Sequence, residues 1–287
     1  MEIGKRKVGP GHPCFIVGEI GQNHNGDVYT ATRLIEMVAG CGVDAVKLQA
    51  RLSREEFSRE ALARPYTGRN SFGRTYGQHR EALDLTPEHF EHLKDRHRYN
   101  RNPAELFTTV CAVGWIEWLE ANDWCRFYKV ASKDMANRRL IEALAATGKP
   151  LIISTGLAPD LAAITQTLDW AGGRANIALM HCVAQYPTPR DHLCLAEIET
   201  LRQEFGGVVG YSDHSAGVKA PVIAAIKYDA DILEVHCTSN RALPGTDHAA
   251  SLEEPGLLAL VNWVREYEAI TLGATGTILQ DINASIL

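Results

Sequence analysis

Short runs of apolar residues recur along the chain and alternate with longer segments whose apolar residues follow helical spacing. Eight runs are rich in Val, Ile and Leu, as parallel strands buried on both faces should be; they span residues 14–18, 45–49, 106–109, 127–131, 151–154, 177–181, 208–212 and 232–236. Amphipathic helices are predicted between them, among others over residues 31–39, 137–146, 195–205 and 220–228. Eight alternations of strand and helix predict an α/β fold, the (β/α)₈ TIM barrel.

An open, doubly wound sheet is the structural alternative. Its phosphate-binding signature, G-x-G-x-x-G, is absent from the first strand-to-helix turn, which reads EIGQNHNGD. A length of 287 residues could also hold two domains, but one α/β barrel typically fills about 250 residues. We therefore expect one TIM-barrel domain over residues 1–287.

The even spacing of the predicted strands is broken between the second and the third. Residues 51–103 form a long insertion there, which contains a helix with Thr86 as its N-cap and Pro87 at its first position. A lid or binding loop and a solvated, charged excursion are both open interpretations of this insertion. At the other end of the chain, residues 273–287 are too few for a further domain.

Composition excludes several classes of function. With 45% hydrophobic and 22% charged residues the chain can bury a full core, and its net charge of −6 provides no overall field that would draw it to nucleic acid or to an anionic membrane. We find neither a signal sequence nor an apolar run near the ~18 residues that span a bilayer, so we expect a cytoplasmic protein. The seven cysteines include no C-x-x-C pair and are expected to be free, buried thiols.

Polar residues gather at the carboxyl ends of the predicted strands, where a barrel carries its site. Two lysines and four hydroxyl side chains suit a small phosphorylated anion or a phospho-carboxylate: Lys47, Lys129, Thr109, Ser132, Ser154 and Ser212. His214 and His236, at neighbouring strand ends, can share a divalent metal that acts as a Lewis acid, with Glu19 or water completing the shell. For each histidine by itself, a hydrogen-bonded core side chain is the alternative. Cys182 and Cys237 directly follow strand-end histidines, so we expect both to point away from the barrel interior.

Eight runs, in order over residues 13–255, resemble the sialic acid synthase family, which includes N-acetylneuraminate synthase and its legionaminate, pseudaminate and spore-coat relatives. The runs are FIVGEIGQNHNGD, GVDAVKLQA, TYGQHREALDLT, YKVASKDMAN, KPLIISTGLA, HCVAQYPTPRD, VVGYSDHSAG and EVHCTSNRALPGTDHAASLEE. The resemblance implies a transferase that condenses phosphoenolpyruvate (PEP) with an open-chain aldose, such as N-acetylmannosamine or a related sugar. The products are a 3-deoxy-2-keto sugar acid and phosphate.

The resemblance also implies a role for each site residue. PEP binding falls on the six residues already grouped as an anion site: Lys47, Thr109, Lys129, Ser132, Ser154 and Ser212. Glu19, His214 and His236 are implied as catalytic residues, and the two histidines would hold Mn²⁺ or Mg²⁺. Gln49, Tyr186 and Asp247 fall on the positions that bind the sugar.

The sugar-binding half of the site departs from the family pattern. Val183 and Ala184 stand where relatives favour polar residues, and Lys133 with Asp134 replaces a Gly-Glu pair. We also expect the chain to lack the C-terminal antifreeze-like domain of the family, which makes a homodimer or a separate antifreeze-like chain a candidate partner. Two other functions stay open: a barrel subunit that binds sugar phosphates without turnover or only with a partner, and a metal-dependent aldolase or isomerase.

Overall fold

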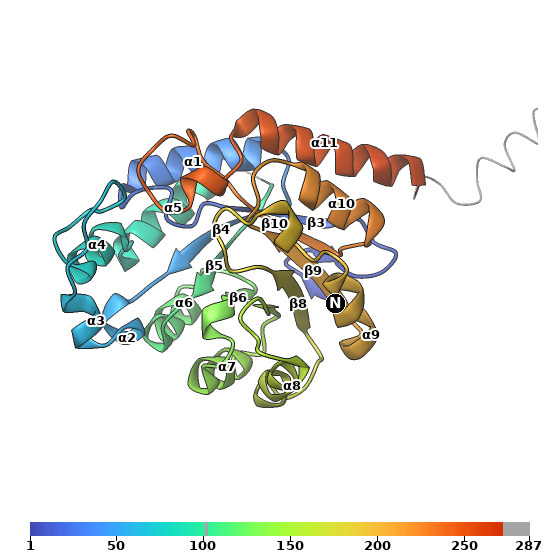
Figure 1. Ribbon diagram of the computed structural model, residues 1–287, viewed down its shortest axis with the longest axis horizontal. Helices are drawn as coiled ribbons and strands as arrows, with labels where there is room; N and C mark the ends of the chain where they lie inside the picture. The colour runs from blue at the N-terminus through green and yellow to red at the C-terminus, as the bar shows by residue number, and fades with distance from the viewer. Residues whose placement is uncertain (101–102, 272–287) are drawn as a thin grey trace, which may run out of the picture.

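The computed structural model describes residues 1–100 and 103–271, so the tail expected at 273–287 lies outside the described residues. Eight parallel strands close into a barrel in which β10 pairs with β3 (Figure 1). They are β3 (Phe15–Glu19), β4 (Ala45–Ala50), β5 (Glu105–Val110), β6 (Tyr128–Val130), β7 (Leu151–Ser154), β8 (Ile177–Cys182), β9 (Val208–Asp213) and β10 (Ile232–His236). The predicted (β/α)₈ fold is confirmed, and both ends of each predicted strand lie within one residue of the observed ends.

Helices surround the barrel; those before α11 lie between consecutive strands, and α11 follows the last strand (Figure 1). They include α1 (Val28–Gly40), α5 (Pro87–Tyr99), α6 (Ile116–Ala121), α7 (Arg138–Ala145), α8 (Leu161–Trp170), α9 (Glu197–Phe205), α10 (Lys219–Lys227) and α11 (Glu254–Thr271). In α7, Leu140, Ile141 and Leu144 are buried, and the Asn137 side chain accepts a hydrogen bond from the Leu140 N–H at the amino end. In the described part of the chain, no helix is long and apolar enough to cross a bilayer.

The segment between β4 and β5 is more helical than expected. It contains α2 (Ser53–Glu56), α3 (Arg59–Ala63) and α4 (Tyr76–Leu83), which lie together at one side of the barrel (Figure 1). The helix α5 has the predicted Thr86 cap and buries Phe90 and Leu93. Since α5 is the regular connection back to β5, the extra structure is confined to residues 51–86 rather than 51–103.

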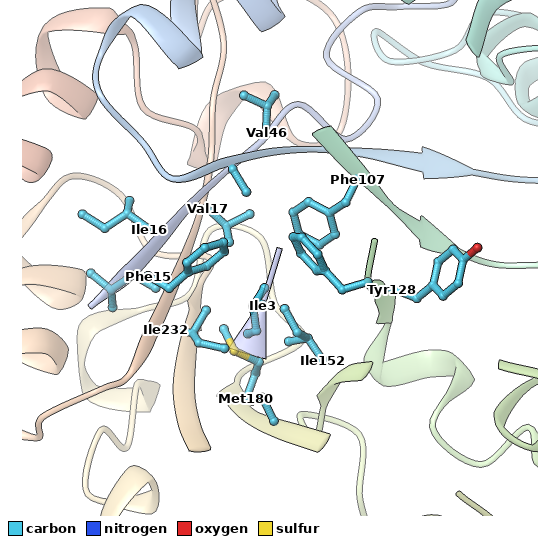
Figure 2. Close-up of a cluster of buried hydrophobic side chains, with 14 of the residues drawn as sticks. Ile3, Phe15, Ile16, Val17, Val46, Phe107, Tyr128, Ile152, Met180 and Ile232 are labelled. Carbon is cyan, nitrogen blue, oxygen red and sulfur yellow. The ribbon is translucent and has the colours of Figure 1, made fainter. Parts of the chain in front are cut away.

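A hairpin of β1 (Glu2–Ile3) and β2 (Arg6–Lys7), which the sequence pattern did not predict, lies at the amino ends of the barrel strands. Its Ile3 side chain is fully buried, and Figure 2 shows it among Phe15, Ile152, Met180 and Ile232. Apolar residues therefore fill this end of the barrel. The polar residues lie at the opposite end, where Glu19 pairs in register with Lys47 and His236.

Candidate active site

A cavity of about 260 Å³ lies at the carboxyl ends of the barrel strands. It is lined by every residue that the sequence predicted for the site: Glu19, Lys47, Gln49, Thr109, Lys129, Ser132, Ser154, Tyr186, Ser212, His214, His236 and Asp247. Most of them reach it because alternate side chains of a strand point to the same face, so inward positions of neighbouring strands converge. The fold thus brings together residues that are far apart in the sequence.

Two buried lysines share one carboxylate deep in this cavity. Oε1 of Glu234 lies 3.2 Å from Nζ of Lys47, and Oε2 lies 3.8 Å from Nζ of Lys129. The Ser212 hydroxyl donates to Oε1 of Glu234 over 3.2 Å. All four side chains are buried, so the ion pairs are poorly screened by solvent.

Hydroxyl groups extend this cluster along the cavity wall. Nζ of Lys47 donates to Oγ1 of Thr109 over 2.8 Å, and Nζ of Lys129 donates to Oγ of Ser154 over 2.5 Å. On the next loop, the Ser132 hydroxyl accepts a hydrogen bond of 3.1 Å from the N–H of Gly156. Cationic heads surrounded by hydroxyl groups form a site suited to a small, highly charged anion.

The two buried glutamates of the cavity have opposite pKa shifts. Burial by itself would raise the pKa of Glu234, but the charges of Lys129, Lys47 and His236 outweigh it and lower that pKa to about 2. Burial raises the pKa of Glu19, an effect that Lys47 opposes and Glu234 reinforces. Both carboxylates lie 3.2 Å from Nζ of Lys47, but the shifts favour the ionised form of Glu234 and move Glu19 toward its protonated form.

His214 and His236 lie side by side, with ring centroids 5.5 Å apart. Nδ1 of His214 donates to the Val183 carbonyl over 2.6 Å, so Nε2 carries the lone pair; it accepts a hydrogen bond of 2.7 Å from the Tyr186 hydroxyl and is the atom that would bind a metal. Burial, with a contribution from His236, lowers the pKa of His214 to about 3, so this imidazole is neutral. Nδ1 of His236 is buried without a hydrogen-bond partner, 3.8 Å from Oδ2 of Asp247.

These two imidazoles fit part of the shell of a divalent metal. Both are inward-facing, and Nδ1 of His236 is a buried atom without a hydrogen-bond partner that a cation would satisfy. Oε2 of Glu19 already lies 3.2 Å from Nζ of Lys47. Within residues 1–100 and 103–271, however, no three His, Cys, Asp or Glu side chains form a group that could hold a metal by themselves. Any ion bound here needs further ligands from water or from a substrate.

Three further polar side chains line the cavity near Gln49: Gln22, Arg51 and Lys133. Oε1 of Gln49 accepts a hydrogen bond from Nη1 of Arg51 over 3.1 Å, and Nε2 of Gln49 donates to Oε1 of Glu19 over 2.8 Å. Arg51 has no role among the sequence predictions. It lies one residue beyond the end of β4, and extending the alternation of Lys47 and Gln49 by two residues would have found it.

The expectation for Cys182 is wrong. Cys182 lines the cavity, with Sγ 3.0 Å from the Ser132 hydroxyl oxygen, while the preceding His181 points outward and bonds the Leu193 carbonyl over 2.8 Å. Met180 lies in the barrel core (Figure 2), so the alternation along β8 turns Cys182 inward as well. All seven cysteines are free, but Cys194 is exposed rather than buried.

Glu234 is a cavity residue that is absent from the sequence predictions. Its inward position on β10, two residues before His236, is the signal that could have placed it in the site. Burial of several compensated charges at the carboxyl end of a (β/α)₈ barrel is a property of enzyme active sites. The fold and the cavity therefore define the class of protein as a barrel enzyme.

Comparison with known proteins identifies the family. Residues 34–275 match the model of the NeuB family. N-acetylneuraminate-9-phosphate synthase of Homo sapiens is 35% identical over 273 residues, 92% of this chain and 72% of the relative. N,N'-diacetyllegionaminic acid synthase of Campylobacter jejuni is 31% identical over 261 residues, 88% of this chain and 76% of the relative. The chain belongs to the NeuB family, which confirms the resemblance in its sequence.

A solved structure agrees with this assignment. The N-acetylneuraminic acid (sialic acid) synthetase of Leptospira borgpetersenii, crystallised with citrate, superposes with a TM-score of 0.82 at 28% identity; the match covers 99% of this chain and 95% of that one. The chain is accordingly an enzyme of the transferase-type synthases.

Proposed function

We propose that this enzyme condenses PEP with the open-chain form of an aldose to give a 3-deoxy-2-keto sugar acid and phosphate. The observation that carries the proposal is the buried cluster of Lys47, Lys129 and Glu234, which lies in the same cavity as the pair His214 and His236. Relatives named as synthases of N-acetylneuraminate 9-phosphate and of N,N'-diacetyllegionaminic acid support the reaction class.

The PEP half of the site consists of Lys47 and Lys129 with the hydroxyl groups of Thr109, Ser132, Ser154 and Ser212. The lysines neutralise the phosphate and carboxylate charges, and the hydroxyl groups donate to the oxygens that the lysines do not reach. The two lysines are 2–3% exposed, so a bound anion would interact with them at low dielectric.

The reaction forms one carbon–carbon bond and one carbon–oxygen bond from water to C2, and it breaks the C2–O bond to phosphate. C3 of PEP attacks the aldehyde carbon, whose oxygen gains a proton, and positive charge develops at C2. Water adds to C2 and loses a proton. The tetrahedral intermediate then expels phosphate by C–O cleavage, and the C2 hydroxyl becomes the keto group as its proton passes to the departing phosphate. Glu19, whose pKa is raised by burial, is placed to give the proton to the aldehyde oxygen or to take one from the water.

His214 and His236 would hold a divalent ion, Mn²⁺ or Mg²⁺, which would supply Lewis-acid polarisation of the aldehyde when bound. Burial keeps the His214 imidazole neutral, and the hydrogen bond to the Val183 carbonyl fixes its tautomer, so that Nε2 can act as a ligand. Gln49, Tyr186 and Asp247 are the sugar-binding residues of this proposal. Ala184, an apolar residue that lines the cavity, points to an N-acetylmannosamine-like or altered sugar as the acceptor; Val183 is not among the lining residues.

The test is to incubate the purified chain with PEP, Mn²⁺ or Mg²⁺ and a panel of aldoses and aldose phosphates. We expect phosphate release together with a 3-deoxy-2-keto acid, both dependent on an aldose and both abolished by EDTA. Folded protein that releases no phosphate with any aldose would contradict the proposal. Turnover of sugars without PEP would favour an aldolase or isomerase, and activity only after addition of a separate antifreeze-like chain would favour a partner-dependent subunit.

A further inference from the structure

A chain of three hydrogen bonds connects the inserted segment to Glu19. Oε2 of Glu56, at the end of α2, accepts from Nη2 of Arg51 over 2.6 Å. Nη1 of Arg51 donates to Oε1 of Gln49 over 3.1 Å, and Nε2 of Gln49 donates to Oε1 of Glu19 over 2.8 Å. Each contact is within normal hydrogen-bond distance, and the two that end on a carboxylate are the shortest.

Arg51 decides which way the Gln49 amide points. A guanidinium has donors and no acceptor, so it can contact only the amide oxygen of Gln49. Nε2 of Gln22 donates to that oxygen as well, over 3.4 Å. With Oε1 held in this way, Nε2 is directed to the Glu19 carboxylate.

Glu56 in turn fixes Arg51. Its side chain is 1% exposed, and Oε2 also accepts from Nζ of Lys133 over 3.0 Å. Oε1 of Glu56 accepts from the N–H of Leu52 over 3.1 Å. A buried carboxylate between two cations that both line the cavity ties the insertion to the barrel at this point.

Arg51 also keeps a donor unused. Nε of Arg51 is buried without a hydrogen-bond partner, although the side chain lines the cavity and is 10% exposed. Lys129 bonds Ser154 and pairs with Glu234, whereas Lys47 lies 3.2 Å from both Glu19 and Glu234, so the chain meets the lysine cluster only through Glu19. The connection therefore reaches the side of the cavity that holds Gln49.

We infer that Arg51 is a positioning residue for the acceptor sugar: Glu56 of the insertion holds it, and it orients the Gln49 amide against Glu19. The inference rests on the proposed function, because that proposal makes Gln49 a sugar-binding residue. It also gives the insertion a defined part in the site, because Glu56 holds the residues Arg51 and Gln49 that face the acceptor sugar.

The kinetic test compares Glu56→Gln and Arg51→Met with wild type. Both variants should lower kcat/KM for the acceptor by about tenfold or more, the effect of losing a hydrogen bond to a charged group, and should leave KM for PEP within about twofold. Arg51→Lys should recover part of the loss, since its ammonium still donates to Oε1 of Gln49. Arg54→Met is the matched control on α2, because Arg54 is 82% exposed and pairs only with the exposed Glu81 in the described structure.

A second measurement does not depend on turnover. The side-chain amide signal of Gln49, assigned by its loss in Gln49→Glu, should shift in the NMR spectra of Glu56→Gln and Arg51→Met and stay in place in Arg54→Met. An unshifted amide in both variants, or equal rises in KM for PEP and for the acceptor, would overturn the inference. A shifted amide in a protein that never consumes PEP would support the positioning by Arg51 and defeat the proposed reaction. If Arg51→Met does not fold, the kinetics and the Gln49 amide signal of the isosteric variant Glu56→Gln decide whether the inference holds.

Discussion

Tyr186 contacts His214 in two ways: its hydroxyl donates to Nε2 over 2.7 Å, and its ring stacks on the imidazole with centroids 4.0 Å apart. Since Nδ1 of His214 is bonded to the Val183 carbonyl, Nε2 is the atom through which His214 would bind a metal. Tyr186 therefore occupies the proposed ligand atom. The hydroxyl has to leave Nε2 before His214 can bind an ion, and 44% of Tyr186 is exposed, which leaves room for that movement.

Replacing Tyr186 with Phe should tighten metal binding. The substitution keeps the stacked ring and removes the competing hydrogen bond, which is worth about 0.5–1.5 kcal/mol, so the dissociation constant for Mn²⁺ should fall by about 2–10-fold. Titration calorimetry with MnCl₂ and no substrate measures this directly. Tyr29→Phe, at an exposed tyrosine on α1, is the control. Unchanged or weaker binding by Tyr186→Phe would show that the hydroxyl does not compete with the ion.

Two histidines at strand ends should respond differently to replacement by Ala. His236 faces the cavity, so His236→Ala should abolish metal-dependent turnover and leave the protein folded. His181 faces outward to the Leu193 carbonyl, so His181→Ala should cost about 1–3 kcal/mol of unfolding free energy while KM for both substrates stays unchanged. Urea unfolding and steady-state kinetics separate the two effects. Wild-type turnover in His236→Ala would remove that residue from the proposed metal site.

Lys129→Met should weaken PEP binding far more than acceptor binding. The substitution keeps the length of the side chain and removes the charge-assisted contacts of Nζ, worth about 1.5–3 kcal/mol, or roughly 10–150-fold in affinity for PEP. Inhibition by inorganic phosphate gives a second readout of the same site. Lys227→Met, at the exposed end of α10, provides the control. A variant with the PEP affinity of wild type would contradict the role of Lys129 in the anion site.

The barrel and the deep half of the site could be predicted because both depend on local patterns. Each strand is a short apolar run, and the alternation of side chains along a strand is enough to put Lys47 and Gln49 on one face. Once the strands close into a barrel, polar residues at their carboxyl ends necessarily converge. That reasoning needs only the order of the elements and the direction of the side chains.

Other features depend on contacts between distant segments. The partnership of Glu56 with both Arg51 and Lys133 requires α2 to lie over the ends of β4 and β6, which no pattern in residues 51–86 indicates. Met180 packs in the core, and its position sets which residues of β8 face the barrel interior. If the predicted alternation is shifted by one residue, His181 and Cys182 exchange the inward and outward orientations. The residue type at a strand end does not reveal whether its side chain points inward or outward.

Acid should destabilise the protein through His24. Burial lowers the pKa of this histidine to about 4, whereas an unfolded histidine titrates near pH 6.5. The unfolded state therefore binds a proton first as the pH falls, and stability is lost between about pH 6.5 and 4, with a slope of up to about 1.4 kcal/mol per pH unit for one proton. Nδ1 of His24 accepts from the N–H of Gly26 over 3.0 Å, a bond that protonation at Nδ1 breaks.

His24→Gln should flatten that dependence. Urea unfolding at pH 7, 6 and 5 should show a smaller loss of unfolding free energy on acidification for His24→Gln than for wild type. His192→Gln, at an exposed histidine, should keep the wild-type slope. Equal slopes in wild type and His24→Gln would mean that other groups take up the proton.

Two contacts from the insertion to the loop after β10 should affect the acceptor. The Arg69 guanidinium donates to the Ala242 carbonyl over 2.8 Å, and Oδ1 of Asn70 accepts from the N–H of Gly245 over 3.1 Å. This loop leads to Asp247, which lines the cavity.

Replacing both Arg69 and Asn70 with Ala should therefore raise KM for the acceptor by about 2–10-fold, the effect of one or two lost hydrogen bonds, and leave KM for PEP within about twofold. Hydrogen exchange at residues 240–247 should become faster, while Arg74→Ala, an exposed residue of the same segment, should change neither measurement. Normal exchange and normal kinetics in the double variant would instead assign residues 64–75 to a solvated excursion with no part in acceptor binding.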